Sequence, residues 1–197
     1  IFIISFILSL ILLSNCSSIN ENNDLVTIEP KDIFWAKSGL DSCWIYSIVS
    51  LLNGNLIAGT NYGIYKSSDV GLNWEKVKQD SIGTATCVYM NPDGKVFIGT
   101  YNKGIFVSSD NGNSWTNLGL QNVNISSISV DAFGKIFAGT RGNGIFASGS
   151  NYNWKEVNPD FNYKIFPSLL INSQNIIFAG DAGVYRSDDG GNSWSLK

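Results

Sequence analysis

The chain has 197 residues, of which 44% are hydrophobic and 13% aromatic, enough to bury the core of a single domain. Only 15% of the residues are charged and the net charge is -3, which argues against the basic face of a nucleic-acid-binding protein. Histidine is absent, so the sequence lacks the usual general base and the commonest zinc ligand.

The beginning of the chain reads as an export signal. Residues 1–13 form an almost unbroken apolar run, which fits the hydrophobic region of a signal peptide and is too short to span a bilayer. Cys16 and a polar stretch follow, an arrangement that resembles a bacterial lipoprotein signal, although Asn15 stands where a smaller residue is usual. The resemblance implies a signal peptide over residues 1–16, lipidation of Cys16 and a lipid anchor in the cell envelope. The alternative is an ordinary secretory signal with an incidental cysteine.

The sequence begins without Met and without a basic segment, which predicts that an N-terminal piece is missing. Residues 17–33 are expected to form a polar linker, and residues 34–197 a repeat domain. Two markers recur about every 40 residues, and two independent markers with one period are a strong sign of repeats. The first marker is Trp at positions 35, 74, 115, 154 and 194, and the second is Gly at positions 59, 99, 139 and 180.

Each period contains four short apolar runs separated by turn residues, which is typical of strands. In the first period the runs are residues 46–51, 56–60, 63–67 and 74–77. Four strands in about 40 residues, repeated radially, predict an all-β fold of four-stranded antiparallel β-propeller blades, about four of them. The repeats are placed at about residues 34–77, 78–118, 119–157 and 158–197.

The turn between the third and fourth runs carries the pattern S-x-D-x-G-x-[SN]-W. The Asp can accept hydrogen bonds from its own turn, the Gly can take a positive φ, and the Trp can cover apolar surface. The alternative role for the Asp is a metal ligand or catalytic acid. We favour the structural role because no second acid recurs with it. The copies comprise Ser67, Asp69, Gly71 and Trp74; Ser108, Asp110, Gly112 and Trp115; and Ser187, Asp189, Gly191 and Trp194. A fourth copy at residues 148–154 has lost the Asp.

These turns resemble Asp-box (BNR) repeats, which build the blades of sialidases, xyloglucanase-type glycosidases, sortilin-like receptors and photosystem II assembly factors. The resemblance covers residues 35–194, most of the chain. It implies a parent of six to eight blades, and a box located opposite the active face. Missing C-terminal repeats are therefore expected.

The connections on the other face vary between repeats, and variable loops on a fixed scaffold are where binding usually occurs. The possible ligand-facing residues are Trp44, Tyr62, Tyr101 and Arg141. The alternative is that they are ordinary solvated loop residues. Cys43 and Cys87 hold non-equivalent positions, so we expect no disulfide between them, and Cys87 is expected to be a small packed residue.

Two functions remain open at this point. The first is a non-enzymatic scaffold that binds a protein or a glycan. The second is a glycoside hydrolase of sialidase or xyloglucanase type with catalytic residues partly in missing blades. Sialidase resemblance implies three substrate-binding arginines, whereas this chain has only Arg141 and Arg186. The loop carboxylates show no pairing, so no catalytic, cofactor or metal residue is assigned; they are Asp41, Asp80, Asp160 and Asp181. A sensor propeller of a signalling protein is a third, less favoured idea.

Overall fold

The computed structural model describes residues 17–19, 25–27, 40, 42–79, 81–157 and 165–197. The chain divides into two compact units, Ile1–Lys37 and Ser38–Lys197. In the first unit, β1 (Ser17–Ile19) pairs antiparallel with β2 (Leu25–Thr27), within the range expected to be a linker. The expected signal peptide, Cys16 and Trp35 lie outside the described residues. Within the described ranges, no helix has the length and apolar character needed to cross a membrane.

The second unit consists of four antiparallel sheets, each with four strands in chain order. Sheet 1 contains β3 (Ile45–Ser50), β4 (Leu56–Thr60), β5 (Gly63–Ser67) and β6 (Glu75–Lys76). Sheet 2 contains β7 (Ala85–Met90), β8 (Val96–Thr100), β9 (Ile105–Ser108) and β10 (Thr116–Asn117). Sheet 3 contains β11 (Ile125–Val130), β12 (Ile136–Thr140), β13 (Ile145–Ser148) and β14 (Trp154–Glu156). Sheet 4 contains β15 (Ser168–Ile171), β16 (Ile177–Gly180), β17 (Val184–Ser187) and β18 (Ser195–Leu196). The prediction of four-stranded propeller blades is confirmed.

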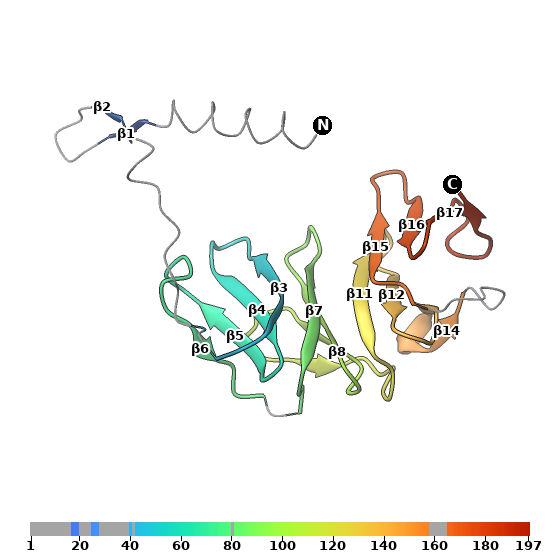
Figure 1. Ribbon diagram of the computed structural model, residues 1–197, viewed down its shortest axis with the longest axis horizontal. Coiled ribbons are helices and arrows are strands. Elements are labelled where there is room, and N and C mark those ends of the chain that lie inside the picture. Colours follow the sequence, from blue (N-terminus) through green and yellow to red (C-terminus); the bar gives the residue numbers. More distant parts are fainter. Residues whose placement is uncertain (1–16, 20–24, 28–39, 41, 80, 158–164) are drawn as a thin grey trace. The chain divides into compact units, whose positions relative to one another are not determined.

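The first strands of successive sheets lie side by side, in the order β3, β7, β11 and β15 (Figure 1). The repeating glycine of the second strand allows this close approach. A Cβ added to Gly59 would lie 2.9 Å from the carbonyl oxygen of Ala85, and one added to Gly99 would lie 2.5 Å from Cγ2 of Ile125. Any larger residue at these positions would therefore force neighbouring sheets apart.

The hydrophobic core lies between consecutive sheets and not in one central mass. Between sheets 1 and 2 it includes Ile57, Ile98, Phe106 and Trp115. A second cluster of the same kind, which includes Ile105 and Ile136, joins sheets 2 and 3. Each sheet therefore depends on its neighbours for burial, as expected of a repeat architecture.

A β-bulge recurs in the first strands of sheets 1, 2 and 3, where the register shifts around Tyr46, Thr86 and Ser126. A bulge re-aims the side chain of the extra residue. The Thr86 hydroxyl donates a hydrogen bond to the carbonyl oxygen of Ile125 at 2.5 Å, and the Ser126 hydroxyl donates to that of Phe166 at 2.6 Å. In sheets 2 and 3 the bulge thus directs a hydroxyl across the gap to the next sheet.

The Trp positions hold their register even where the box is incomplete. At the worn copy, a short 3-10 turn (Ser150–Tyr152) leads into β14, and the Trp154 indole N–H donates to the carbonyl oxygen of Leu118 at 2.8 Å. Trp194 donates equivalently to the carbonyl oxygen of Val157 at 2.9 Å. Both indoles therefore bond to the outer part of the preceding sheet.

Burial of the box Trp can be tested by substitution. Trp115 is only 8% exposed and packs between sheets 1 and 2, so Trp115→Ala should lower the free energy of unfolding by about 3–5 kcal/mol, measured by urea denaturation. Trp44 is 75% exposed and is the matched control, because Trp44→Ala should change that free energy by less than about 0.5 kcal/mol. A loss below about 1 kcal/mol for Trp115→Ala would contradict this core assignment.

Candidate functional site

The strand registers divide each sheet into two edges with different connections. We call "box edge" the edge with the Asp-box turns and the turns between first and second strands. We call "linker edge" the edge with the turns between second and third strands and the connections from one sheet to the next. The residue pairs Thr60↔Gly63 and Leu56↔Ser67 place the two ends of the β4–β5 hairpin on opposite edges. The same meander recurs in the other three sheets.

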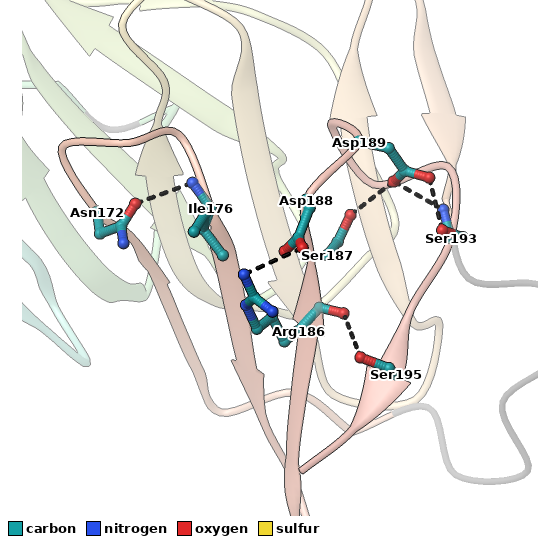
Figure 2. Close-up of polar contacts among 8 residues, drawn as sticks. All are labelled: Asn172, Ile176, Arg186, Ser187, Asp188, Asp189, Ser193 and Ser195. Carbon is teal, nitrogen blue, oxygen red and sulfur yellow. Dashed lines mark hydrogen bonds and ion pairs between the residues drawn. The ribbon is translucent and has the colours of Figure 1, made fainter.

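The Asp boxes use their polar groups within their own turns. In sheet 4, the Ser187 hydroxyl donates to Asp189 Oδ1 at 2.8 Å and accepts from the backbone N–H of Gly191 at 2.9 Å. The same Asp189 oxygen accepts from the backbone N–H of Ser193 at 2.9 Å, as Figure 2 shows. The box at Ser108 and Asp110 has the same bonds, with distances of 2.7 to 2.9 Å. These carboxylates are therefore occupied by the turn that carries them.

The first box has the same arrangement with a different partner for its Asp. The Ser67 hydroxyl donates to Asp69 Oδ1 and accepts from the backbone N–H of Gly71, both at 2.8 Å. The backbone N–H and the side-chain amide of Asn73 donate to the two oxygens of Asp69. The indoles of Trp74 and Trp115 each donate to a carbonyl oxygen within their own box.

These bonds stabilise the charged form of the box carboxylates. The Ser114 hydroxyl, followed by the Ser114 backbone N–H, lowers the pKa of Asp110 to about 2. Ser193 acts in the same way on Asp189 and lowers its pKa to about 2. For Asp69, hydrogen bonds from the backbone N–H and then the side chain of Asn73 lower the pKa. All three carboxyls are therefore ionised near neutral pH and have no proton to donate there.

Arg186 is held at the box edge as well. Arg186 directly precedes the box of sheet 4. Its guanidinium lies 3.0 Å from Oδ2 of Asp188, which is within that box (Figure 2). Arg141 is located at the linker edge, at the end of β12 in sheet 3. The two arginines thus face opposite edges, and the structure does not bring them together around one substrate carboxylate.

The linker edge carries the residues that the sequence singled out as ligand-facing. Trp44 is 75% exposed, Tyr62 56% and Tyr101 57%, and Arg141 is also exposed. The Trp44 backbone N–H donates to Asn61 Oδ1 at 2.8 Å, and the Asn61 N–H donates back to the Trp44 carbonyl oxygen at 3.2 Å. This pair of bonds brings Trp44 beside the turn of Tyr62.

The other two residues occupy equivalent places in the next sheets. The Tyr101 N–H donates to the carbonyl oxygen of Thr84 at 3.0 Å, and the Arg141 N–H donates to that of Asn124 at 2.9 Å. The Oδ1 atom of Asn124 is buried and has no hydrogen-bond partner among the residues that the structure describes. Because this oxygen is buried, it is not part of the exposed surface of the linker edge.

The linker edge also holds a cavity of about 410 Å³ that the sequence analysis did not identify. Its polar lining consists of Gln79, Ser81, Asn102, Lys103, Asn117, Gln121 and Asn122. Phe106 and Trp115 complete it from the core between sheets 1 and 2. The sequence analysis expected these loops to vary but did not single out their amide side chains. A signal was present, because Gln79 and Gln121 occur in two consecutive connections between sheets.

The box edge has two further cavities, whose polar side chains are largely engaged. One, of about 430 Å³, is lined by the turns between the first and second strands of sheets 2, 3 and 4. Each of these turns begins with a side-chain oxygen that accepts a backbone N–H at 2.9 Å: Asn91 from Lys95, Asp131 from Lys135, and Asn172 from Ile176 (Figure 2). In the other cavity, Lys66 Nζ donates to Asn113 Oδ1 at 2.8 Å.

Metal and thiol chemistry find little support in the described part of the chain. No group of three or more His, Cys, Asp or Glu residues is arranged there to hold a metal ion. Cys43 and Cys87 are free thiols in the part of the chain that the structure describes. Burial raises the pKa of the Cys87 thiol to about 12, and Cys87 packs against Ile125 and its neighbours in the core. Of the four loop carboxylates considered in the sequence, only Asp181 lies in the described ranges, and Asp41, Asp80 and Asp160 lie outside them.

Comparison with known proteins identifies the fold. No protein-family model and no curated protein matches the sequence. The extracellular domain of BT4673 from B. thetaiotaomicron matches the structure with a TM-score of 0.62 and 17% identity, over 89% of this chain and 23% of that chain. The GH74 enzyme of Niastella koreensis matches with 0.62 and 17%, over 90% of this chain and 33% of that one. YCF48 bound to D1 peptide matches with 0.56 and 20%, over 88% and 56%.

The chain therefore spans between 23% and 56% of the length of these three structures. Their identities are low, so the likeness concerns the fold alone. The chain has the four-stranded blades of a β-propeller, as its Asp-box turns predicted.

The low pKa of the box carboxyls has a consequence in acid. Because the folded pKa of Asp110 is about 2 and its ordinary value is 3.8, its contribution to stability is present above pH 3.8 and is lost as the pH falls through about 2. A carboxyl-carbon NMR titration should give a midpoint of about 2 for Asp110, and Ser114→Ala should raise it. A midpoint near 3.8 in the unsubstituted protein would contradict the bonding described for the box.

Proposed function

We propose that this protein is an exported, lipid-anchored β-propeller that acts as a non-enzymatic binding or assembly scaffold for a protein or a glycan. The binding surface is the linker edge. The observation that carries the proposal is the exposure of three large aromatic side chains, Trp44, Tyr62 and Tyr101, together with Arg141, on this one edge. The box edge, in contrast, uses its carboxylates inside its own turns.

The chemistry of these four side chains suits recognition. Tyr, Trp and Arg are the residues most enriched among those that contribute strongly to binding, because they offer large contact area together with a polar group. The backbone bonds of Trp44, Tyr101 and Arg141 fix their loops on the sheets beneath, so little order is lost on binding.

The structural neighbours support two parts of this proposal, binding and export, at the level of the fold. YCF48 is bound to a D1 peptide, so a propeller of this kind serves as a protein-binding scaffold. BT4673 contributes an extracellular domain, which is consistent with export. The lipid anchor rests on the lipoprotein-like sequence around Cys16.

A glycoside hydrolase is the second candidate, and the similarity to GH74 enzymes favours it. Such an enzyme needs two carboxylates about 5–9.5 Å apart across one cleft. Asp181 is a loop carboxylate of the described linker edge, and Arg186 is committed to Asp188 at the box edge. The described residues thus offer better means for holding a ligand than for cleaving one.

The binding surface can be tested with two matched triple variants. Trp44→Ala/Tyr62→Ala/Tyr101→Ala removes the aromatic side chains of the linker edge, and Val70→Ala/Leu72→Ala/Phe133→Ala removes exposed apolar side chains of the box edge. On an array of oligosaccharides and extended peptides, the first variant should lose at least about 10-fold in affinity for whatever the protein binds. The second should bind normally. Equal loss in both variants, binding that neither variant changes, or no binding by the unsubstituted protein would contradict the proposal.

Lipidation has its own test at Cys16. Mass spectrometry of the membrane fraction should show Cys16 as an acylated N-terminal residue, since the thiol of Cys16 is the expected attachment point. Cys16→Ser should remove the acyl chains and release the protein from the membrane fraction. An unacylated Cys16 retained within the chain would show that the segment is an ordinary secretory signal.

A further inference from the structure

We infer that the cavity at the linker edge of sheet 2 is a subsite for a neutral carbohydrate, an inference that rests on the proposed binding role of this edge. The cavity is lined by the turn between β8 and β9, the outer strand β10, and the connections that enter and leave sheet 2. Its volume of about 410 Å³ falls within the range of small-molecule sites, about 300–1,000 Å³.

The walls of this cavity are fixed by hydrogen bonds between its segments. The Asn122 N–H donates to the carbonyl oxygen of Asn102 at 2.9 Å, which ties the outgoing connection to the β8–β9 turn. Asn117 Nδ2 donates to the carbonyl oxygen of Lys103 at 3.0 Å, while Asn117 Oδ1 accepts from the Gly119 N–H at 2.7 Å. The walls are thus set before a ligand arrives, which reduces the entropy cost of binding.

In the same connection, two residues have a backbone conformation that residues other than glycine rarely adopt. Leu120 has a φ of 59° and Asn122 a φ of 62°, both in the left-handed region. A branched residue such as Leu is seldom found there, and it persists only where surrounding contacts enforce it. The hydrogen bonds at Asn117, Gly119 and Asn122 are those contacts. They hold Gln121 and Asn122 at the rim of the cavity.

Four of the seven polar side chains of this cavity are free to bind, whereas Asn117 bonds within its connection and the Gln79 amide donates to the Ser81 hydroxyl at 3.1 Å. Among the described residues, the side chains of Asn102, Lys103, Gln121 and Asn122 make no hydrogen bond or ion pair. At the box edge, the Asn and Asp side chains that begin the turns accept backbone N–H groups of their own loops. Free hydrogen-bonding capacity is therefore gathered in the linker-edge cavity.

The composition of the lining selects the ligand class. An amide side chain offers both a donor and an acceptor, and so does each hydroxyl of a sugar ring, so several amides can bind neighbouring hydroxyl groups. Lys103 is the one charged side chain among the described lining residues, which gives little to attract a polyanion. Phe106 and Trp115 are 3% and 8% exposed and offer little apolar surface for the side chains of a peptide.

The test uses side-chain amide NMR signals, because these groups would contact the sugar directly. The probes are cellotetraose, maltotetraose and mannotetraose as neutral sugars, with tetragalacturonate and tetraglycine as comparators, each at millimolar concentration. At least one neutral sugar should shift the NH₂ signals of Asn102, Gln121 and Asn122 in a saturable manner, and the comparators should not.

The cavity variant is Asn102→Ala/Gln121→Ala, and the matched control is Asn143→Ala/Gln174→Ala, two exposed amides outside the cavity. Both variants should keep the unfolding midpoint of the unsubstituted protein. The cavity variant should weaken sugar binding by at least about 10-fold, whereas the control should leave it unchanged.

Three outcomes would overturn the inference: no neutral sugar shifts the cavity amides, a comparator shifts them equally, or the cavity variant binds normally. If a probe perturbs only Trp44, Tyr62, Tyr101 or Arg141, the cavity inference fails while the proposed function stands. If the cavity amides respond but the aromatic triple variant binds its array ligand unchanged, the cavity inference stands and the aromatic surface of the proposed function fails.

Discussion

The structure depends on how closely one sheet can approach the next. A single four-stranded sheet of this size cannot bury its apolar residues alone, so each one uses the face of its neighbour. At the inner strands the limit is set by glycine, because a Cβ at Gly59 or Gly99 would reach into the first strand of the next sheet and one at Gly139 would reach the carbonyl oxygen of Phe166. Toward the outer strands the space is filled by indoles, as by Trp115 between sheets 1 and 2. The box turn belongs to the same design, since it ends the third strand and returns the chain to place the Trp.

The way each edge connects the strands explains why the two edges differ in how many polar side chains remain free to bind a ligand. The box edge must reverse the chain within a few residues, and its Ser, Asp and Asn side chains satisfy backbone N–H groups in doing so. The linker edge has longer connections between sheets, whose backbone bonds join one connection to another, as Asn122 joins Asn102. Their side chains are left available. Binding capacity therefore accumulates at the linker edge without weakening the scaffold.

The sequence predicted the blades because the repeated features are local. The spacing of Trp74, Trp115 and Trp154 and the alternation around them depend on residues within one repeat, so their structure could be inferred from one copy and checked in the next. The exposed positions of Tyr62 and Tyr101 followed from the same register. The worn box at residues 148–154 kept its Trp in place, and the Leu118 carbonyl that accepts its indole N–H was not foreseen because it belongs to another repeat.

The amide-lined cavity and the hydroxyl bonds of Thr86 and Ser126 were not predicted, because each of them involves residues from two repeats. Gln79 and Gln121 meet the same cavity although they lie in different connections, and only the fold brings them together. In the sequence, Thr86 and Ser126 look like ordinary strand residues. Only the bulge in the structure directs their hydroxyls toward the next repeat. Amides recur in two consecutive connections, but no spacing in the chain shows that side chains from two repeats meet. Features made within one repeat do have such a spacing.

The bulged hydroxyls also bear on how these sheets respond to mechanical load. The packed apolar faces resist displacement through the shape of their side chains, which is a non-directional constraint. A hydrogen bond is directional and is lost over a fraction of an ångström, so the bonds from Thr86 to Ile125 and from Ser126 to Phe166 resist shear along the strands. Under tension on the chain, sheets 2 and 3 could therefore not slide past each other before the bond from Thr86 to Ile125 breaks.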